Sequence, residues 1–248
     1  MGASGMVQAQ EQNSPQYPFI STSAVAVTTG DYGTGDDTTV TQLSQAFKYQ
    51  GPAGEIGMMV PYLFRNGGAV TVGESRRLRS GQPLPNEADG LGDIQVMGKY
   101  FWLEEAERQP GIDLAARVKI PTADEDEGLG TGRFDVGFGP QLHKRFGPLI
   151  TFADAELVLR DKPSGSSIES VRLDYSLGVG YPFTEQFTGY VSLDGGTKAN
   201  SGAEVPLEIV LSGVFKATDT IGVNGFILAG LTDGSPDFGA GTGITVKF

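Results

Sequence analysis

The last eleven residues of the chain, 238–248, read FGAGTGITVKF and alternate between two kinds of side chain. Every second residue from Phe238 to Phe248 is apolar, aromatic or threonine, and the residues between them are glycine, threonine or lysine. Successive side chains of a strand point to opposite faces, so one face is apolar and the other is small or charged. This pattern predicts a strand that contacts lipid and ends at the membrane interface on an aromatic ring.

The same alternation recurs along the rest of the chain, between clusters of residues that are typical of turns. From Val171 to Tyr181, for example, every second residue is apolar or aromatic, and the residues between are arginine, aspartate, serine and glycine. The pattern predicts about twelve strands, over residues 18–30, 38–50, 53–65, 91–102, 111–121, 133–146, 148–160, 168–182, 186–195, 204–216, 219–231 and 237–248.

Short and long connections follow one another between these segments. Those at 51–52, 147 and 217–218 are short, whereas those at 66–90 and 122–132 are long and polar. Outer-membrane barrels combine short periplasmic turns with longer external loops. With an even number of strands, this alternation predicts an all-β fold, a transmembrane antiparallel up-and-down β-barrel of about twelve strands with both termini in the periplasm.

The composition agrees with one barrel domain. The chain has 248 residues and a mean hydropathy of −0.14, and it holds no run of about 18 apolar residues that would make a transmembrane helix. A closed barrel needs only alternating apolar positions, because pairing every strand leaves no unsatisfied backbone edge in the hydrocarbon. We assign residues 18–248 to an outer-membrane barrel and residues 1–17 to a flexible N-terminal remnant that includes vector-derived residues.

Charge and cysteine content exclude other classes of function. The net charge of −12 argues against nucleic acid as a partner, because binding to the phosphate backbone needs cations. The chain has no cysteine, so it carries neither disulfides nor thiolate metal sites. We therefore expect no cofactor and no nucleic-acid partner.

Aromatic residues collect where the predicted strands end, which is typical of the rings of aromatic side chains at both membrane interfaces. A soluble barrel or sandwich with ordinary core aromatics is the alternative interpretation. The aromatic residues at segment ends are Tyr62, Phe64, Tyr100, Trp102, Phe146, Tyr181, Phe183, Phe187, Phe215 and Phe248.

Charged residues occupy the strand positions that alternate with the apolar ones, so they would converge inside the barrel. Only a wet interior tolerates so many charges, which places the apolar face outward. The set indicates either a polar conduit that selects solutes or a cross-strand lattice of ion pairs that fills a narrow barrel. Its signs are mixed, which favours a lattice with a narrow passage. The predicted lumen residues are Asp93, Lys99, Asp113, Arg117, Lys119, Asp135, Arg145, Asp154, Glu156, Arg160, Arg172, Asp174, Glu208, Lys216 and Lys247, and Glu55 and Asp194 share their face.

The acidic run Asp124-Glu125-Asp126-Glu127 lies in a predicted external loop. Its carboxylates, Asp124 and Asp126 above all, provide the oxygen ligands that Ca²⁺ prefers, but the run lacks the spacing of an EF-hand loop. A solvated acidic loop and divalent bridging to anionic lipopolysaccharide are the other interpretations.

His143 is the only histidine, so a Ser-His-Asp hydrolytic site would have to use it. Twelve-stranded outer-membrane phospholipases place their catalytic groups on the lipid-facing wall. His143 shares its face with Asp135 and Gln141, which we assign to the lumen. We therefore expect a polar lumen residue near the periplasmic rim and no enzyme.

Four stretches resemble one bacterial outer-membrane family, labelled meta-pathway phenol degradation-like, or transporter-like. The longest is VKIPTADEDEGLGTG at 118–132, and the others are TGDYG at 29–33, GLGD at 90–93 and LTDGSPDFGAG at 231–241. The resemblance implies an outer-membrane barrel associated with the uptake of small hydrophobic or aromatic compounds. The C-terminal strand ending in Phe248 also resembles the signal read by the barrel-assembly machinery.

The sequence therefore predicts an outer-membrane channel through which small molecules pass by diffusion along a narrow charged lumen. Its expected partners are outer-membrane lipid and lipopolysaccharide, small solutes and the assembly machinery. Two alternatives stay open at this point: a closed structural or adhesive barrel with external binding loops, and a membrane-embedded lipid hydrolase.

Overall fold

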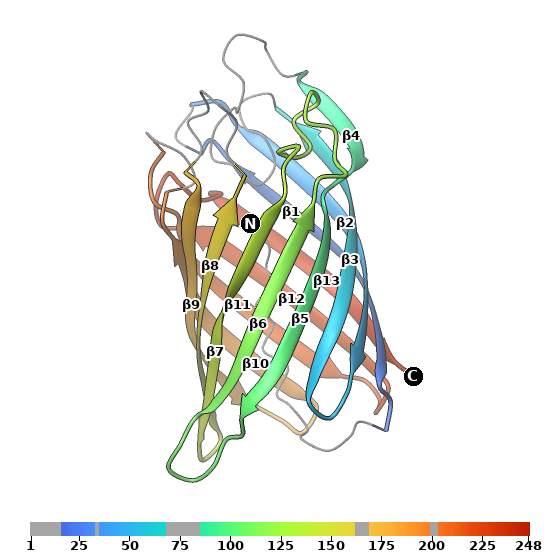
Figure 1. Ribbon diagram of the computed structural model, residues 1–248, viewed down its shortest axis with the longest axis vertical. Coiled ribbons are helices and arrows are strands. Elements are labelled where there is room, and N and C mark those ends of the chain that lie inside the picture. The colour runs from blue at the N-terminus through green and yellow to red at the C-terminus, as the bar shows by residue number, and fades with distance from the viewer. Residues whose placement is uncertain (1–15, 33–34, 68–84, 162–168, 199–202) are drawn as a thin grey trace.

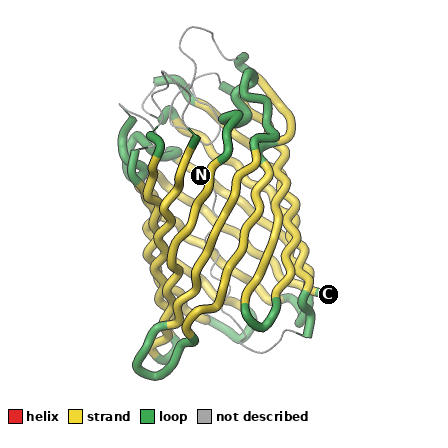
Figure 2. Tube along the Cα trace, viewed as in Figure 1, coloured by secondary structure: helices red, strands yellow, loops and turns green. Residues whose placement is uncertain are grey.

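The computed structural model describes residues 16–32, 35–67, 85–161, 169–198 and 203–248. Within these ranges the chain forms strands and loops, and no helix there is long and apolar enough to cross a membrane (Figure 2). The strands are β1 (Phe19–Gly30), β2 (Thr38–Gln50), β3 (Gly54–Asn66), β4 (Glu87–Leu91), β5 (Ile94–Leu103), β6 (Gly111–Ile120), β7 (Asp135–Phe146), β8 (Leu149–Arg160), β9 (Val171–Pro182), β10 (Phe187–Gly196), β11 (Leu207–Lys216), β12 (Ile221–Gly230) and β13 (Phe238–Lys247).

The strands form one antiparallel sheet that closes on itself. From β5 to β13 each strand pairs with its neighbours in sequence, β13 pairs with β1, and β2 pairs with both β1 and β3. Short β4 and β5 both pair with β3, so together they fill one place and the ring has twelve strand positions. The predicted twelve-stranded up-and-down barrel is confirmed, and Figure 1 shows its strands tilted around a common axis.

The predicted strand 91–102 starts three residues too early, because β5 begins at Ile94, and the short strand β4 lies almost wholly within residues 66–90, which were predicted to be a loop. Gly92 and Asp93 separate the two strands, and pairing with β3 is lost around Pro61. Proline has no backbone N–H to donate to the ladder, although its carbonyl still accepts a bond from the Gly92 amide at 2.9 Å. The interruption lets Asp93 leave the strand and turn its side chain inward.

The two ends of the barrel sequence meet at the rim of short turns. The Phe19 amide donates to the Phe248 carbonyl at 3.0 Å, the Phe248 amide donates back at 2.9 Å, and their rings stack with centroids 6.0 Å apart. Residues 1–15 lie outside the described residues, and so does residue 168, the first residue of the predicted strand 168–182. The flexible remnant at 1–17 therefore stays a prediction.

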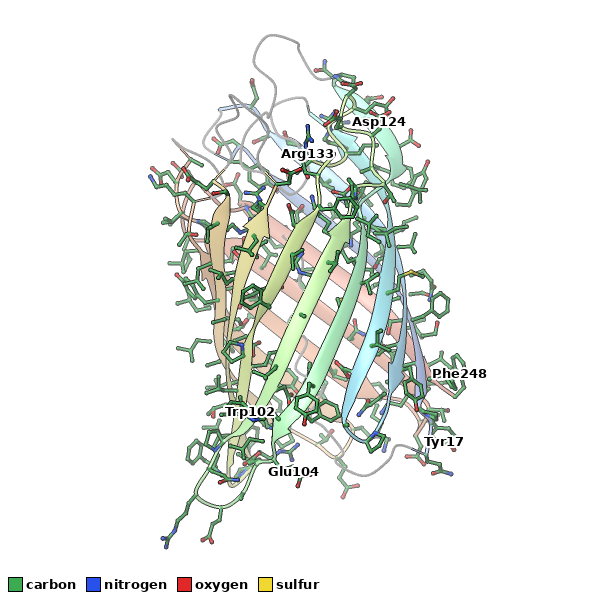
Figure 3. All side chains as sticks on the ribbon, viewed as in Figure 1. Tyr17, Trp102, Glu104, Asp124, Arg133 and Phe248 are labelled. Atoms are coloured by element: carbon green, nitrogen blue, oxygen red, sulfur yellow. The ribbon has the colours of Figure 1, made fainter. Side chains whose placement is uncertain are left out.

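The outer surface is apolar, as the alternation predicts. Large side chains such as Leu177 and Ile244 keep 62% and 54% of their surface exposed, an arrangement that only a lipid environment makes favourable over a whole sheet. The aromatic residues expected at strand ends are all exposed outward. Trp102 and Phe248 lie toward the short-turn end, and Asp124 and Arg133 lie at the opposite end (Figure 3).

Gly139 provides a test of the inner packing of the wall. A Cβ at this position would lie 1.8 Å from the Ala155 carbonyl oxygen, whereas a Cβ at outward-facing Gly98 meets nothing closer than 3.9 Å. Gly139→Ala should therefore lower the free energy of unfolding by about 1–3 kcal/mol, because the backbone must shift to fit one methyl group. Urea titration of the detergent-folded barrel measures the effect. Gly98→Ala is the control, and equal midpoints for the two variants would contradict this account.

Candidate functional site

The predicted lumen residues occupy inward positions of their strands, opposite the exposed apolar set, except Asp93, which lies between β4 and β5. Several are deeply buried, including Asp113, Lys119, Arg160 and Glu208. Lys216 differs, because its side chain extends to the rim and pairs with Asp219 of the next turn at 2.9 Å. The inner wall is therefore charged along most of its height. Its ion pairs include Arg172 with Asp174 on β9, at 2.6 Å, and three groups at different levels.

The level nearest the long loops centres on Lys119. Its Nζ lies 2.9 Å from Asp93 Oδ2 and 3.0 Å from Asp135 Oδ2, and it donates to Thr131 Oγ1 at 2.5 Å. The side chains of Lys119, Asp93 and Asp135 are at most 13% exposed. One cation thus satisfies two nearly buried carboxylates from neighbouring parts of the wall.

The middle level contains an ion pair that skips a strand. Arg117 of β6 donates to both carboxylate oxygens of Glu156 of β8, at 3.1 and 2.6 Å. Gly137 of β7 lies between them, and a Cβ there would fall 2.2 Å from Glu156 Oε1. A glycine on the intervening strand is therefore what allows this bidentate pair to form.

The third level lies near the short turns. Glu55 accepts from Lys48 at 2.8 Å and lies 3.4 Å from Lys99, so one carboxylate bridges strands β2, β3 and β5. Each of the three side chains is 16–25% exposed.

The wall formed by β12, β13 and β1 is different, because its inward residues are small and uncharged over most of its height. In the order of the ring, these strands lie opposite β6, β7 and β8, which carry the Lys119 and Arg117 groups. Phe226 and Leu228 of β12 and Ile20 of β1 are the large exceptions; the Phe226 ring lies against Gly241, and the Leu228 side chain lies against Gly239. The inward residues of this wall include Thr22, Ala24, Ala26, Thr28, Gly222, Asn224, Gly239, Gly241 and Gly243.

The cap segment, residues 121–134, folds into the mouth at the long-loop end. Leu129 is 2% exposed and packs with Leu63 and Ala123. Arg65, also 2% exposed, donates to the carbonyls of Gly67, of Pro85 at 2.9 Å and of Glu127 at 2.8 Å. The Ala123 amide donates to Asp93 at 3.1 Å. The cap segment is thus attached to the lumen wall by buried polar contacts.

The acidic run forms the outer turn of this cap segment. Asp124 Oδ1 accepts from the amides of Asp126 at 2.9 Å and Glu127 at 3.2 Å, an arrangement that stabilises a turn. The four carboxylate residues are exposed. Within the described ranges, no three residues of the metal-binding types lie close enough to hold a metal ion.

His143 faces the lumen. Its ring covers Gly111 of β6, where a Cβ would lie 2.1 Å from Nε2. A hydrolase acting on membrane lipid would need this histidine on the outer wall, where β7 instead presents Val136 and Phe138. The arrangement does not place the histidine where lipid could reach it.

Sequence reasoning missed the inward aromatic residues Phe152, Tyr190 and Phe226, and it missed Arg65. The rings of Phe152 and Tyr190 cover Gly178 and Gly180 of β9, and their centroids are 6.4 Å apart. Glycines at alternate inward positions were the available signal, because they leave space that a neighbouring ring can fill. Nothing in the sequence shows which ring fills it.

The outer wall carries a cluster of polar side chains on β1 and β2 that the alternation did not predict. Gln45 of β2 accepts from the Ser23 hydroxyl at 2.6 Å and donates to the Ser21 hydroxyl at 2.9 Å. A shallow, mostly apolar depression of about 340 Å³ adjoins it, with Leu43, Val60 and Tyr62 among its lining residues. The three polar side chains satisfy one another, which lowers their cost on a lipid-facing surface.

The longest of the short turns, 104–110, is attached to β7 through Glu105. The carboxylate accepts from the Arg145 amide at 2.8 Å and from Lys144 Nζ at 3.2 Å. Partial burial favours the neutral acid, but these two donors outweigh it and hold the pKa of Glu105 below its usual value. The turn and the end of β7 therefore form one hydrogen-bonded unit.

The family model described as "Putative MetA-pathway of phenol degradation" matches residues 66–248. The chain belongs to this family. The match covers the cap segment and every strand from β4 to β13, and it confirms the resemblance that the sequence stretches indicate. The chain itself has the closed twelve-stranded architecture of solved outer-membrane β-barrels.

Three solved structures show how widely this fold is shared. The COG4313 outer membrane channel from Pseudomonas putida F1 superposes with a TM-score of 0.74 at 13% identity, covering 97% of this chain and 99% of that one. The beta domain of the Bordetella autotransporter BrkA gives 0.59 at 13% identity over 93% and 100%. The KdgM porin in complex with disordered oligogalacturonate gives 0.54 at 6% identity over 92% and 99%. At such identities the likeness establishes the fold.

One relative found by sequence comparison is named as a carboxypeptidase and not as a membrane barrel. The probable serine carboxypeptidase CPVL of Mus musculus is 29% identical over 155 residues, which are 60% of this chain and 29% of that protein. The chain thus spans less than a third of the length of this relative. The match carries no argument about activity.

The hydrogen bonds of Arg65 should hold the cap segment in its folded position and protect it from proteases. Arg65→Met removes the donors to three carbonyls, and each buried carbonyl left unsatisfied costs about 1–3 kcal/mol. We expect the acidic turn at 124–127 to be cut by a glutamate-specific protease much faster than in the unaltered protein, while the strands stay intact. Arg108→Met, in the exposed turn at the other end, is the control. Equal cleavage rates for Arg65→Met and Arg108→Met would contradict the attachment.

The lowered pKa of Glu105 gives a pH dependence with a defined sign. An acid whose pKa is depressed by folding stabilises the folded state above its unfolded pKa, and this contribution is lost as the pH falls through the folded pKa. Glu105→Gln should therefore melt below the unaltered protein at neutral pH, and the difference should vanish in acid. Thermal melts over a pH series measure it, with Glu104→Gln as control. A difference that persists in acid would contradict this account.

Proposed function

We propose that this barrel is an outer-membrane channel through which small molecules pass by diffusion. The observation that carries the proposal is the division of the inner wall: ion-paired strands β6 to β8 lie opposite the mostly small, uncharged inward residues of β12, β13 and β1. Glycine and alanine leave space beside the charged wall that longer side chains would fill. A solute would pass along this neutral wall with the charged groups facing it.

The comparisons support a transport function of this kind. The family description refers to phenol degradation, and the similar solved structures include an outer membrane channel and a porin bound to an oligosaccharide. From the family we infer that the solutes are small hydrophobic or aromatic compounds. No covalent chemistry is part of this proposal.

The lipid and assembly partners follow from the same architecture. The apolar outer wall contacts outer-membrane lipid, and lipopolysaccharide surrounds the long-loop end. The C-terminal strand β13, which ends on exposed Phe248, is the segment that we expect the barrel-assembly machinery to bind. The exposed acidic turn of the cap segment is where divalent bridging to lipopolysaccharide would occur.

A closed structural barrel is the second candidate, and the cap segment favours it. Leu129, Arg65 and Asp93 hold that segment in the mouth through buried contacts. If the cap segment and the ion pairs fill the lumen, the external loops would serve as binding surfaces. Conductance separates the two candidates.

The Arg117–Glu156 pair provides the sharpest test of a conducting lumen. Glu156→Gln leaves the cation of Arg117 facing the passage, and Arg117→Gln leaves the anion of Glu156. In planar bilayers under a KCl gradient, the first variant should shift the reversal potential toward anion selectivity and the second toward cation selectivity. Lys216→Gln, which alters an exposed rim pair, is the control and should shift it least.

Two results would overturn the channel. One is the absence of current steps from protein whose folding is shown by heat-modifiable gel migration. The other is an unchanged reversal potential in both Arg117 and Glu156 variants, since ions would then pass by a route away from these groups. Either result would favour the closed barrel.

A further inference from the structure

One sector of the lumen near the short turns combines an aromatic surface with a cation. The register of β7 to β10 aligns four inward residues in one row: Arg145 pairs with Ile150, Ile150 with Gly180, and Gly180 with Tyr190. Because the strands are adjacent and the four positions share one face, their side chains line a single band of the inner wall.

The ring of Tyr190 is held in a fixed place on this band. It leans from β10 across Gly180 of β9, where a Cβ would lie 2.4 Å from Cδ1. Phe152 from β8 covers Gly178 in the same manner and meets Tyr190 edge to face, with centroids 6.4 Å apart. Phe152 is 5% exposed and serves as support, whereas half-buried Tyr190 presents ring surface to the lumen.

Arg145 lies at the other end of the row with its side chain exposed to the lumen rim. Its backbone amide is fixed by Glu105, yet among the described residues its guanidinium forms no ion pair, unlike Arg117, Lys119 and Arg172. Adjacent strands lie about 4.8 Å apart, so Gly180, beneath the Tyr190 ring, is two strand spacings or roughly 10 Å from Arg145. Buried Ile150 forms an apolar floor between them.

The charges at this end of the lumen are balanced. Lys48, Lys99, Lys247 and Arg145 face the carboxylates Glu55, Asp113, Asp154 and Asp194, and Lys48 and Lys99 already pair with Glu55. A carboxylate would therefore be attracted by the Arg145 guanidinium itself and not by a general surplus of cations.

We propose that Arg145, Ile150 and Tyr190 form a subsite for a single-ring aromatic carboxylate. The ring would stack on Tyr190 over Ile150, and the carboxylate would accept hydrogen bonds from the Arg145 guanidinium. A neutral phenol would gain only the stacking, and an aliphatic carboxylate only the charge. The proposal rests on the channel function, because the ligand reaches the site through the lumen.

Benzoate, acetate and phenol separate these contributions. We expect benzoate to block single-channel current at low concentration, and acetate and phenol to need at least about tenfold more, since each lacks one of the two interactions. Arg145→Gln and Tyr190→Leu should each weaken benzoate block by about tenfold or more, whereas Tyr190→Phe, which keeps the ring, should change it less than about twofold.

Lys247→Gln is the matched control, because it removes one lumen cation from the same end on the opposite wall. Folding of each variant is checked by heat-modifiable gel migration, and calorimetric titration of benzoate into the detergent-folded barrel measures binding without conduction. Block weakened selectively by the Arg145 and Tyr190 variants would support the subsite.

Three results would overturn the subsite. One is a barrel that conducts in KCl but is indifferent to benzoate, which leaves the channel intact. Another is equal block by benzoate and acetate, and the third is an equal effect of Lys247→Gln and Arg145→Gln, which would show a general charge effect. If no current is seen at all, the channel fails, and calorimetry alone decides whether benzoate binds.

Discussion

The pairing of β13 with both β12 and β1 is the interaction on which the rest of the structure depends. Hydrocarbon offers no partner to a backbone N–H or C=O group, so a sheet in the membrane must close. Closure fixes an inside and an outside for every strand, and strict alternation then sends apolar side chains to lipid and charged ones to the lumen. The charges of the inner wall are thus a direct consequence of the closed ladder.

Glycine is what makes this charged interior possible. Gly137 permits the Arg117–Glu156 pair to pass over β7, and Gly178 and Gly180 hold two aromatic rings. On β13, Gly239 and Gly241 lie beneath the side chains of Leu228 and Phe226, whereas Gly243 is bordered by the small side chains of Ala24 and Asn224 and faces the ion-paired strands across the ring. The same residue type therefore sustains dense packing on one side of the lumen and open space on the other, which is the asymmetry that a passage for solutes needs.

The sequence predicts what depends on local alternation and misses what depends on contact across strands. The positions of Arg117, Lys119 and Asp174 on the inner face follow from period-two patterning alone. The break at Gly92 was missed because its cause, Pro61, lies on the neighbouring strand, and no local signal joins them. Arg65 reads as one more strand residue until the cap segment, more than fifty residues away, is folded over it. Ligand binding likewise depends on contacts across strands, so it could not be predicted from local alternation.

The meeting of Phe19 and Phe248 also has a consequence for how the protein is made. Residues 238–247 follow the other strands of the barrel in the sequence, and they complete the ladder on two sides at once. Until they arrive, β1 and β12 are unpaired edges, each a template for pairing with another chain. A chain in which this strand is not yet paired thus stays open to aggregation, and the closing strand is also the natural point for a helper protein to hold it.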